Sequence, residues 1–384
     1  MIRKLLLILS VFILTTSISV SQEKPRFLTL NGYFSMMQSA LFDSVSGPFV
    51  VDNLLHNRLN FKGYVNDHIT FAAEFRNRLF TGDMVRINPA YSTTIGDDDG
   101  LADLSWNILD KQSFLLNSSV DRFWADFNYG KFQARVGRQR INWGQTLVWN
   151  PNDIFNVYSY FDFDYIERPG SDAIRLQYYP DYSSAFEFAL KADYKNRVTG
   201  AALYRFNTHG YDIQFMAGIF NGEDFVAGTG WSGAIGSVSF RGEATWFQPS
   251  DNLSDTTGTG IFTIGFDKTF SNSSMAQIQV MYCNNPADIL SFGSVYSGNM
   301  STKELAFSEF STFASYTYPI TPLFNIGFSA MLFPDLKGYY SGPSFEYSIA
   351  ENVGLSAYWQ HFESRKNGAQ MRINMGFLRV KLSF

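Results

Sequence analysis

Cysteine is almost absent from this 384-residue chain, and charged residues are scarce. Cys283 is the only cysteine, so no intramolecular disulfide can form. Charged side chains make up 17% of the sequence, whereas a typical soluble domain has about 25%. The formal net charge of −5 gives no sign of a surface built for nucleic acid, so we expect no nucleic-acid partner.

Long apolar runs, helical periodicity and enzyme motifs are missing as well. Beyond its N-terminus the chain has no apolar run long enough for a membrane-spanning helix. It has no His-Glu-x-x-His, no Gly-x-Ser-x-Gly and no Gly-Lys-Ser/Thr phosphate loop. The four histidines, His56, His68, His209 and His361, are scattered along the sequence. These absences disfavour α/β enzymes, and the sequence predicts no catalytic residues and no cofactor.

The first residues have the pattern of a secretory signal peptide. Arg3 and Lys4 precede an apolar run over 5–14, and small residues up to Ser21 resemble a signal-peptidase site before Gln22. A membrane anchor would need about 20 apolar residues, and this run is shorter. We therefore expect residues 1–21 to be a signal peptide and residues 22–384 to form a single domain.

Aromatic residues are abundant, at 17% of the chain, and many lie in segments with period-two alternation. Such alternation places successive side chains on opposite faces of a β-strand. Charged residues occupy the polar face in mid-strand, as at Glu74, Asp126 and Glu187. A narrow soluble core could not hold so many ions without strict pairing, whereas a water-filled lumen can.

The lengths of the connectors favour a transmembrane barrel over a soluble β-sandwich. We place about 18 strands near 27–38, 54–65, 68–80, 119–130, 131–140, 171–180, 183–194, 198–208, 210–220, 225–235, 236–248, 258–270, 274–283, 305–318, 321–333, 337–349, 352–362 and 370–384. The longer connectors, 39–53, 81–118, 141–170, 249–257, 284–304 and 363–369, all fall at one end of the strands. Outer-membrane barrels have long outer loops and short periplasmic turns. The sequence therefore predicts an all-β, transmembrane antiparallel β-barrel of about 16–18 strands.

Two stretches resemble known proteins. The last residues, Arg379-Val-Lys-Leu-Ser-Phe384, resemble the closing strand of bacterial outer-membrane proteins, which implies recognition by the barrel-assembly machinery. Val136-Gly-Arg-Gln-Arg-Ile-Asn-Trp-Gly-Gln145, with Trp149-Asn-Pro-Asn-Asp-Ile-Phe155 and Glu167-Arg-Pro-Gly170, looks like a porin-like group of outer-membrane barrels. Members of that group are taken to be channels, some for phosphate or acidic polysaccharide. The resemblance implies a porin-like barrel of a Gram-negative outer membrane without giving its solute.

Charged residues on the polar face of the predicted strands are candidates for the pore lining. They are Glu74, Arg76, Arg78, Arg122, Asp126, Arg135, Arg138, Arg140, Arg175, Glu187, Lys191, Arg241 and Glu243. Their signs are mixed, and most of them could equally form cross-strand ion pairs that stiffen the wall. We therefore expect weak ion selectivity.

The connector 141–170 is a candidate constriction. It carries Asp153, Asp162, Asp164 and Glu167 among many aromatic residues, and so aromatic a loop would be costly in water. It could fold into the barrel and set its acids against wall arginines, or it could pack over the rim or against a neighbouring subunit. Aspartates 97–99 could in principle bind Ca²⁺, but their spacing matches no EF-hand, so no metal is assigned.

These features favour a channel for small polar or charged solutes, whose other partner is outer-membrane lipid. Two alternatives remain from the sequence. One is a barrel hydrolase of the lipase or protease type, and the other is a closed barrel acting as an adhesin or assembly partner. The transported solute and the oligomeric state, including a homo-oligomer, stay open.

Overall fold

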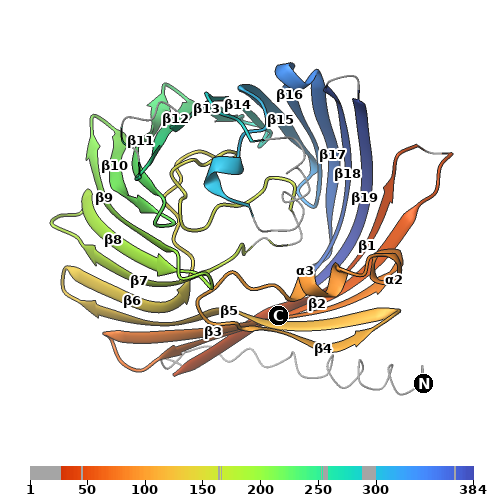
Figure 1. Cartoon of the computed structure of the whole chain (residues 1–384), viewed down its shortest axis with the longest axis horizontal. Helices are drawn as coiled ribbons and strands as arrows, with labels where there is room; N and C mark the ends of the chain where they lie inside the picture. Colours follow the sequence, from red (N-terminus) through yellow and green to blue (C-terminus); the bar gives the residue numbers. More distant parts are fainter. Residues whose placement is uncertain are drawn as a thin grey trace.

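A closed antiparallel β-barrel makes up the protein (Figure 1). The computed structural model describes residues 27–44, 46–162, 165, 167–251, 253, 258–287, 300–366 and 369–384, so the expected signal peptide 1–21 lies outside the described residues. Strand β1 pairs with both β2 and β19, and this pairing closes the wall. Of the 19 strands, 18 form the wall, because β4 pairs only along part of β5.

The strands of the wall match the predicted ones closely, which confirms the predicted fold. They are β1 (Leu28–Phe42), β2 (Val50–Tyr64), β3 (Ile69–Gly82), β5 (Phe114–Tyr129), β6 (Phe132–Gln139), β7 (Ser171–Tyr178), β8 (Ser184–Ala192), β9 (Val198–Thr208), β10 (Tyr211–Phe220), β11 (Asp224–Ile235), β12 (Val238–Pro249), β13 (Thr259–Thr269), β14 (Met275–Cys283), β15 (Phe310–Thr321), β16 (Phe324–Phe333), β17 (Gly338–Ala350), β18 (Val353–Lys366) and β19 (Ala369–Ser383).

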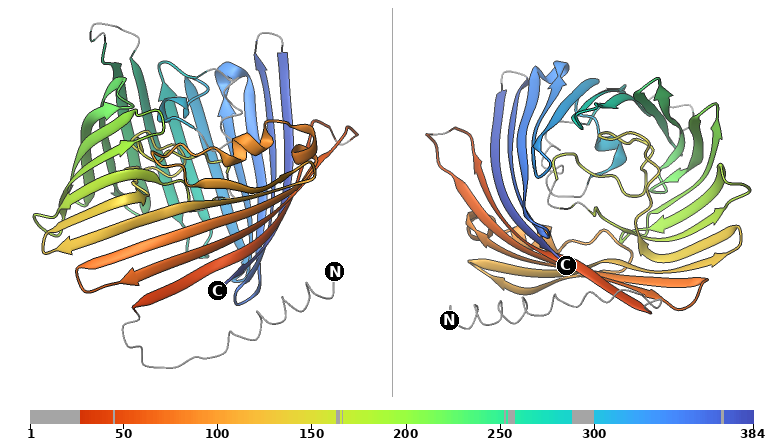
Figure 2. Two further views of the ribbon diagram at one scale, coloured as in Figure 1. Left: turned by 60° about the horizontal axis from the view of Figure 1, so that its bottom comes forward. Right: turned by 180° about the vertical axis from the view of Figure 1, so that it is seen from behind.

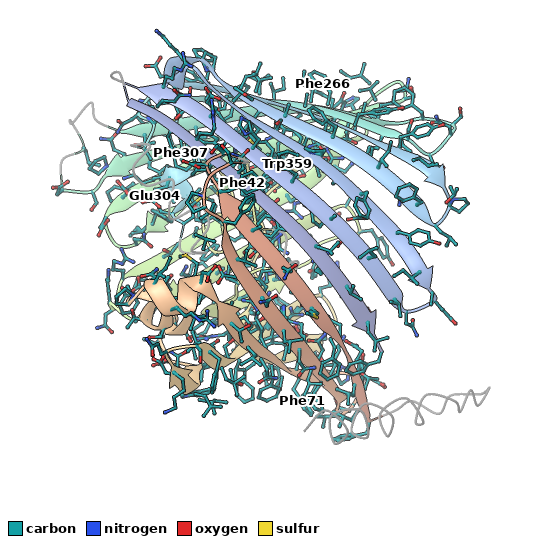
Figure 3. All side chains as sticks on the ribbon, turned by 90° about the vertical axis from the view of Figure 1, so that its right-hand side faces the viewer. Phe42, Phe71, Phe266, Glu304, Phe307 and Trp359 are labelled. Carbon is teal, nitrogen blue, oxygen red and sulfur yellow. The ribbon has the colours of Figure 1, made fainter. Side chains whose placement is uncertain are left out.

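The wall has an apolar outer face and a polar inner face. On β8, Phe186 and Phe188 are 49% and 43% exposed, whereas Glu187 between them is 6% exposed. Figure 3 shows side chains projecting from the outside of the wall, with Phe266 on β13 among them. Exposure of large apolar side chains at alternate positions is what contact with hydrocarbon requires.

The two ends of the barrel differ, as Figure 2 shows. Short turns join the strands at the end where β19 meets the start of β1, and the long connectors lie at the other end. In the turn between β9 and β10, His209 and Gly210 both have positive φ, at 52° and 80°. This backbone shape is typical of the two-residue turns that favour glycine in hairpins.

Stacked aromatic rings lie near the short turns. Phe186, Tyr204 and Phe206 stack with centroid separations of 4.4 and 5.3 Å. This arrangement fits the aromatic girdle expected at a membrane interface. Tyr340 of β17, by contrast, is buried inside the barrel against Phe161, with ring centroids 5.0 Å apart.

Two of the connectors predicted to be long are shorter than expected. Strands β1 and β2 extend to leave only 43–49 between them, and β18 and β19 leave only 367–368. Conversely, the connector after β3 is not a plain loop. It contains the helices α2 (Asp83–Ile87) and α3 (Tyr91–Gly96) and the strand β4 (Ser105–Lys111). No helix in the described part of the chain is long and apolar enough to cross a membrane.

Candidate functional site: the lumen and its inserted connectors

The connector after β6 enters the lumen through a bend at Gly137. Its φ of +113° suits glycine, and a Cβ at this position would collide with the carbonyl oxygen of Phe123 on the neighbouring strand. Just after the bend, Arg138 and Gln139 are both buried, so the chain no longer alternates between the two faces. In Figure 1 the connector runs across the inside of the barrel. Its position inside the barrel agrees with one of the two arrangements that the sequence left open.

Aromatic and aliphatic side chains of this connector pack against the inner face of the wall and form a hydrophobic cluster, called the plug core below. Ile141, Trp143 and Phe155 are buried, and the rings of Trp143 and Phe155 meet edge to face with centroids 4.9 Å apart. On the far side, Trp149 and Tyr160 both contact Phe313 of β15. Burial of these rings explains how so aromatic a connector avoids water.

Gly144, Asn150 and Asn156 stabilise the backbone conformation of the connector. The side chain of Asn156 accepts a hydrogen bond from the backbone N–H of Ile141 at 2.8 Å and donates one to Ser171 at 2.9 Å. A Cβ on Gly144 would overlap the side chain of Asn150. Ile141, Gly144 and Asn150, which belong to the porin-like stretches, therefore help to shape this connector.

Polar side chains of the wall bind the plug by hydrogen bonds. Glu187 Oε1 accepts from the indole N–H of Trp143 at 2.5 Å. Gln279 of β14 accepts from the backbone N–H of Val148 at 3.1 Å and donates to the carbonyl of Trp149 at 3.0 Å. Gln214 of β10 donates to the carbonyl of Trp143 at 2.6 Å.

Glu243 on β12 makes the densest set of these contacts. Its two carboxylate oxygens accept from the backbone N–H groups of Gln145, Thr146 and Asn152, the latter two at 2.7 and 2.8 Å. The hydroxyl of Thr146 lies 3.0 Å from the same carboxylate. Glu243 is completely buried. It therefore lies beneath the connector and faces no open space.

A second connector, between β14 and β15, also reaches into the lumen (Figure 1). Its short helix η2 (Thr302–Glu304) touches the first connector, where the Thr302 hydroxyl donates to the carbonyl of Asp153 at 3.3 Å. Lys303 forms an ion pair with Asp224 at 2.9 Å, and the following residues, including Phe307, are buried in the plug core. Figure 3 labels Glu304 and Phe307 on this segment.

The third connector, between β3 and β5, is fixed to the wall by Arg138. The guanidinium of Arg138 pairs with Asp98 at 2.6 Å and Asp172 at 2.8 Å, and donates to the carbonyl of Ala102 at 2.6 Å. Gly100 forms an isolated β-bridge with Asp193 beyond the end of β8. This connector therefore also narrows the mouth, which the sequence did not predict.

The end of the first connector docks on the opposite side of the barrel, over β1, β2 and β5. Glu167 accepts from the hydroxyl of Tyr33 at 3.2 Å and lies 4.0 Å from the guanidinium of Arg58. Arg122 donates to the carbonyls of Glu167 and Arg168 at 2.9 and 2.6 Å. Glu167 is thus an acid of this connector that lies close to an arginine of the wall.

Arg58 is the buried centre of that docking site. Its guanidinium is inaccessible and bonds to Asp121, to Glu74 at 2.5 Å and to Asn60 at 2.9 Å. Nearby, the guanidinium of Arg76 lies 3.8 Å from the ring centroid of Tyr165. In a regular strand, the adjacent residues Asp121 and Arg122 would point to opposite faces of the wall. A β-bulge in β5, where the register with β3 shifts, buries both.

Most other predicted lining residues form cross-strand ion pairs. Asp126 accepts from Arg135 at 2.7 Å, Arg175 donates to both carboxylate oxygens of Glu187 at 2.7 Å, and Arg241 lies 3.1 Å from Asp267. Arg78 donates to Asn117 at 2.8 Å. Side chains arranged in this way stiffen the wall and balance its charge.

Arg140, Asp153 and Arg168 lie together in the first connector. The Arg168 guanidinium stacks on the ring of Tyr158, 2.8 Å from its centroid. Asp153 is inaccessible, and neither carboxylate oxygen has a hydrogen-bond partner in the described part of the structure. Burial raises the pKa of Asp153 to about 8, although the charge of Arg140 opposes this change. Burial and the neighbouring Arg140 lower the pKa of Arg168 to about 10.

A cavity of ≈ 1220 Å³ remains in the lumen between the inserted connectors and the wall. It is bordered by Arg76, Arg78, Arg138 and Lys191 of the predicted lining, and by Asp162 and Arg168 of the first connector. Asp193, Lys303, Glu304 and residues 97–100 are among the other charged groups on its border. The ammonium of Lys191 also donates to the carbonyl of Phe155 at 3.0 Å.

The structure thus separates the predicted lining residues into two groups. Of the predicted lining residues, Arg76, Arg78, Arg138 and Lys191 border the cavity, and the rest contact other wall residues or the connectors. Asp164 lies outside the described residues. Sequence reasoning missed Gln214, Gln279 and Asn152, because neutral polar residues in strands and loops carry no distinctive signal.

The histidines lie apart in the fold. His56 is buried near Tyr33 and Arg76, His361 contacts Tyr339 and Asn374, and His68 and His209 lie in turns. Within the described ranges, no group of three or more His, Cys, Asp or Glu residues could hold a metal ion.

No family model matches this chain, and no curated protein matches it. Solved structures do resemble it over nearly the whole length. OccAB4 of Acinetobacter baumannii is 11% identical with a TM-score of 0.59, covering 94% of this chain and 100% of that chain. OpdQ of Pseudomonas aeruginosa is 10% identical, with a TM-score of 0.57 and coverages of 94% and 99%. OccK8 (OprE) of Pseudomonas aeruginosa is also 10% identical, with a TM-score of 0.57 and coverages of 93% and 98%. The chain therefore has the 18-strand outer-membrane β-barrel fold of the Occ proteins.

Proposed function

We propose that this protein is an outer-membrane channel through which small polar or charged solutes diffuse. The observation that carries this proposal is a cavity of ≈ 1220 Å³ bordered by charged side chains, inside a wall whose outer face is apolar. Such an arrangement provides an aqueous path through hydrocarbon. The fold shared with the Occ proteins supports the proposal.

The first connector acts as the constriction in this proposal. Its residues 143–149 contact β10, β14 and β15, and residues of β1, β2, β3, β7 and β19 are among those that line the remaining cavity. Arg168 and Lys191 border the remaining space together with Asp162 and Asp193. Opposed charges across a narrow pore orient dipolar solutes and filter ions.

Single-channel recording of the refolded protein in planar bilayers tests the proposal. The intact chain should give stable conductance, and a variant lacking 146–165 should conduct more because the inserted segment is gone. Equal conductance of the two proteins would rule out a constriction by this connector. A folded protein without any conductance would rule out the channel and favour a closed adhesin or assembly barrel.

A panel of sugars and small anions added to the same recordings would identify the solute class. Solutes that enter the cavity should reduce the ionic current in proportion to their size and occupancy. Turnover of lipid or peptide substrates by a non-conducting protein would instead favour the hydrolase alternative.

Export and assembly belong to the same proposal. Residues 1–21 would direct the chain across the inner membrane, and 22–384 would form the barrel. The barrel-assembly machinery would then recognise the C-terminal strand. Phe384 lies at the seam, where its carbonyl accepts from the N–H of Gly32 at 3.0 Å and its ring is 6.0 Å from that of Phe34. Truncation of Phe384 should reduce the yield of folded barrel in membranes.

A further inference from the structure

We propose that Glu243 is a positioning residue that pins the first connector to the wall through its backbone and so sets the free cross-section of the lumen. This inference rests on the proposed channel function and deepens it. Residues 145–152 have no regular secondary structure, so their backbone N–H groups need partners from outside the segment. One carboxylate supplies partners for three of them, at Gln145, Thr146 and Asn152.

The surroundings of Glu243 set it apart from Glu187, the other buried carboxylate that touches this connector. Glu187 keeps two hydrogen bonds from Arg175 and one from Gln177, so its charge is balanced within the wall. In the described residues, every hydrogen-bond partner of Glu243 comes from the connector, and no cation lies within ion-pair distance. The connector therefore supplies the stabilisation that this buried charge requires.

An ionised carboxylate can accept from all three backbone N–H groups. Both oxygens of Glu243 face N–H or O–H groups, and a carboxylate can accept all of them. A glutamine has the same shape but replaces one acceptor by an NH₂ group, which would face the N–H of a connector residue. Glu243→Gln therefore removes one acceptor oxygen and sets an amide N–H against a connector N–H, which weakens the attachment without leaving a hole.

The released segment would stay held at both of its ends. It is held before residue 140 by β6, and beyond residue 165 by the contacts of Glu167 and Arg168 with Tyr33 and Arg122. The wall of β10 to β14 lies behind it, through Gln214 and Gln279. The cavity begins further along the connector, where Ile154 to Ser159 border it. Loss of the attachment should therefore let 145–152 leave the wall, displace the adjoining residues from Ile154 onward that border the cavity, and interrupt the current for short periods.

The test compares wild type with Glu243→Gln and with Glu346→Gln, a matched control. Glu346 lies on β17, is exposed and contacts Tyr358 at 2.6 Å, away from the connector. We expect hydrogen exchange of peptides covering 145–152 to become at least ten-fold faster in Glu243→Gln, and brief closures to become at least ten-fold more frequent. Exchange of strand peptides should not change, and the control should match wild type.

Unchanged exchange of 145–152 in a folded Glu243→Gln protein would overturn the assignment. Faster exchange in a protein that never conducts would leave the positioning role standing and reject the channel function, so the two failures are distinguishable. If Glu243→Gln does not fold, Glu243→Asp takes its place, because it keeps the charge but shortens the side chain that reaches the connector. At least three-fold faster exchange supports the role of Glu243, and no change contradicts it.

Discussion

Arg58 shows how a single side chain can join three parts of the barrel. Its inaccessible guanidinium bonds to Asp121 on β5 and Glu74 on β3, and lies close to Glu167 of the first connector. Removal of one partner from a buried ion pair leaves uncompensated charge, which is far more costly than the loss of a surface pair. Arg58 therefore stabilises both the wall and the docking of the connector.

Replacement of Arg58 by methionine should be strongly destabilising. We expect the free energy of unfolding to fall by about 3–5 kcal/mol, because Asp121 and Glu74 stay in place without a cation. Urea unfolding in lipid vesicles measures this change. The control is Arg372→Met, since Arg372 is more exposed and pairs with Glu363 at 3.1 Å. It should cost about 1 kcal/mol or less. Equal losses in the two variants would contradict the central role of Arg58.

Asp153 makes the docking of the first connector depend on pH. The pKa of this buried carboxyl is raised to about 8 in the folded protein, compared with 3.8 for the free side chain. Between pH 3.8 and about 8, the carboxyl of Asp153 is therefore protonated in the folded state but ionised in the unfolded state. It follows that the contribution of Asp153 to stability is fully present below pH 3.8, declines as pH rises, and is lost above about 8.

An Asp153→Asn variant should be less sensitive to pH than wild type. Its amide stays neutral, so the loss of stability between pH 5 and 8.5 should become smaller, and at pH 8.5 the variant should be the more stable protein. The temperature at which the folded band disappears in gel electrophoresis, measured at both pH values, provides the comparison. An identical pH dependence in the two proteins would show that Asp153 does not titrate in this range.

At the scale of elements, the strands were predictable and the insertion of the connectors was not. Alternation located β8, β14 and β19 from sequence because one face of each must meet hydrocarbon. The connector after β3 contains α2, α3 and β4, which have no strong periodic pattern. The bend at Gly137 decides where the next connector goes, and one glycine in a strand gives no direction by itself.

Substitution of Gly137 should misplace the first connector. In Gly137→Val, the side chain would meet the carbonyl oxygen of Phe123, and the φ of +113° is strained for a β-branched residue. We expect lower stability, by about 1–3 kcal/mol, and a proteolysis-sensitive connector within a barrel that still closes. Limited proteolysis with mass spectrometry would locate the cuts. Cleavage elsewhere, with the connector protected as in wild type, would argue against this role for the bend.

The outer and inner faces of one strand should respond oppositely to a positive charge. On β14, Ile278 is 45% exposed on the outer face, whereas the neighbouring Gln277 lies on the inner face opposite Asp267. Ile278→Arg places the charge in hydrocarbon and should cost about 2–4 kcal/mol. Gln277→Arg can approach Asp267 and should change stability little. Unfolding in vesicles checks both variants, and similar losses would mean that the outer face does not contact lipid.

At the scale of the whole molecule, the mixed charges of the lumen predict weak ion selectivity. Many of them are already paired, as in Arg138 with Asp98 and Asp172, and Lys303 with Asp224. The border of the cavity still carries both signs, so no strong field of one sign is available to exclude an ion. A reversal potential close to zero is expected in a salt gradient. Ideal preference for anions or for cations would contradict this expectation.

The sequence by itself determined that the chain forms a sheet with one apolar and one polar face, with enough strands to close into a barrel. That information is local: alternation along each strand, and short and long connectors in turn, follow from contact with lipid outside and water inside. It also indicated the charged residues of the inner face. Only the tertiary structure decided which of them border open space, because that depends on contacts between residues far apart in the chain. Glu243 meets Thr146 across 97 positions, and no periodicity along the sequence encodes such a contact.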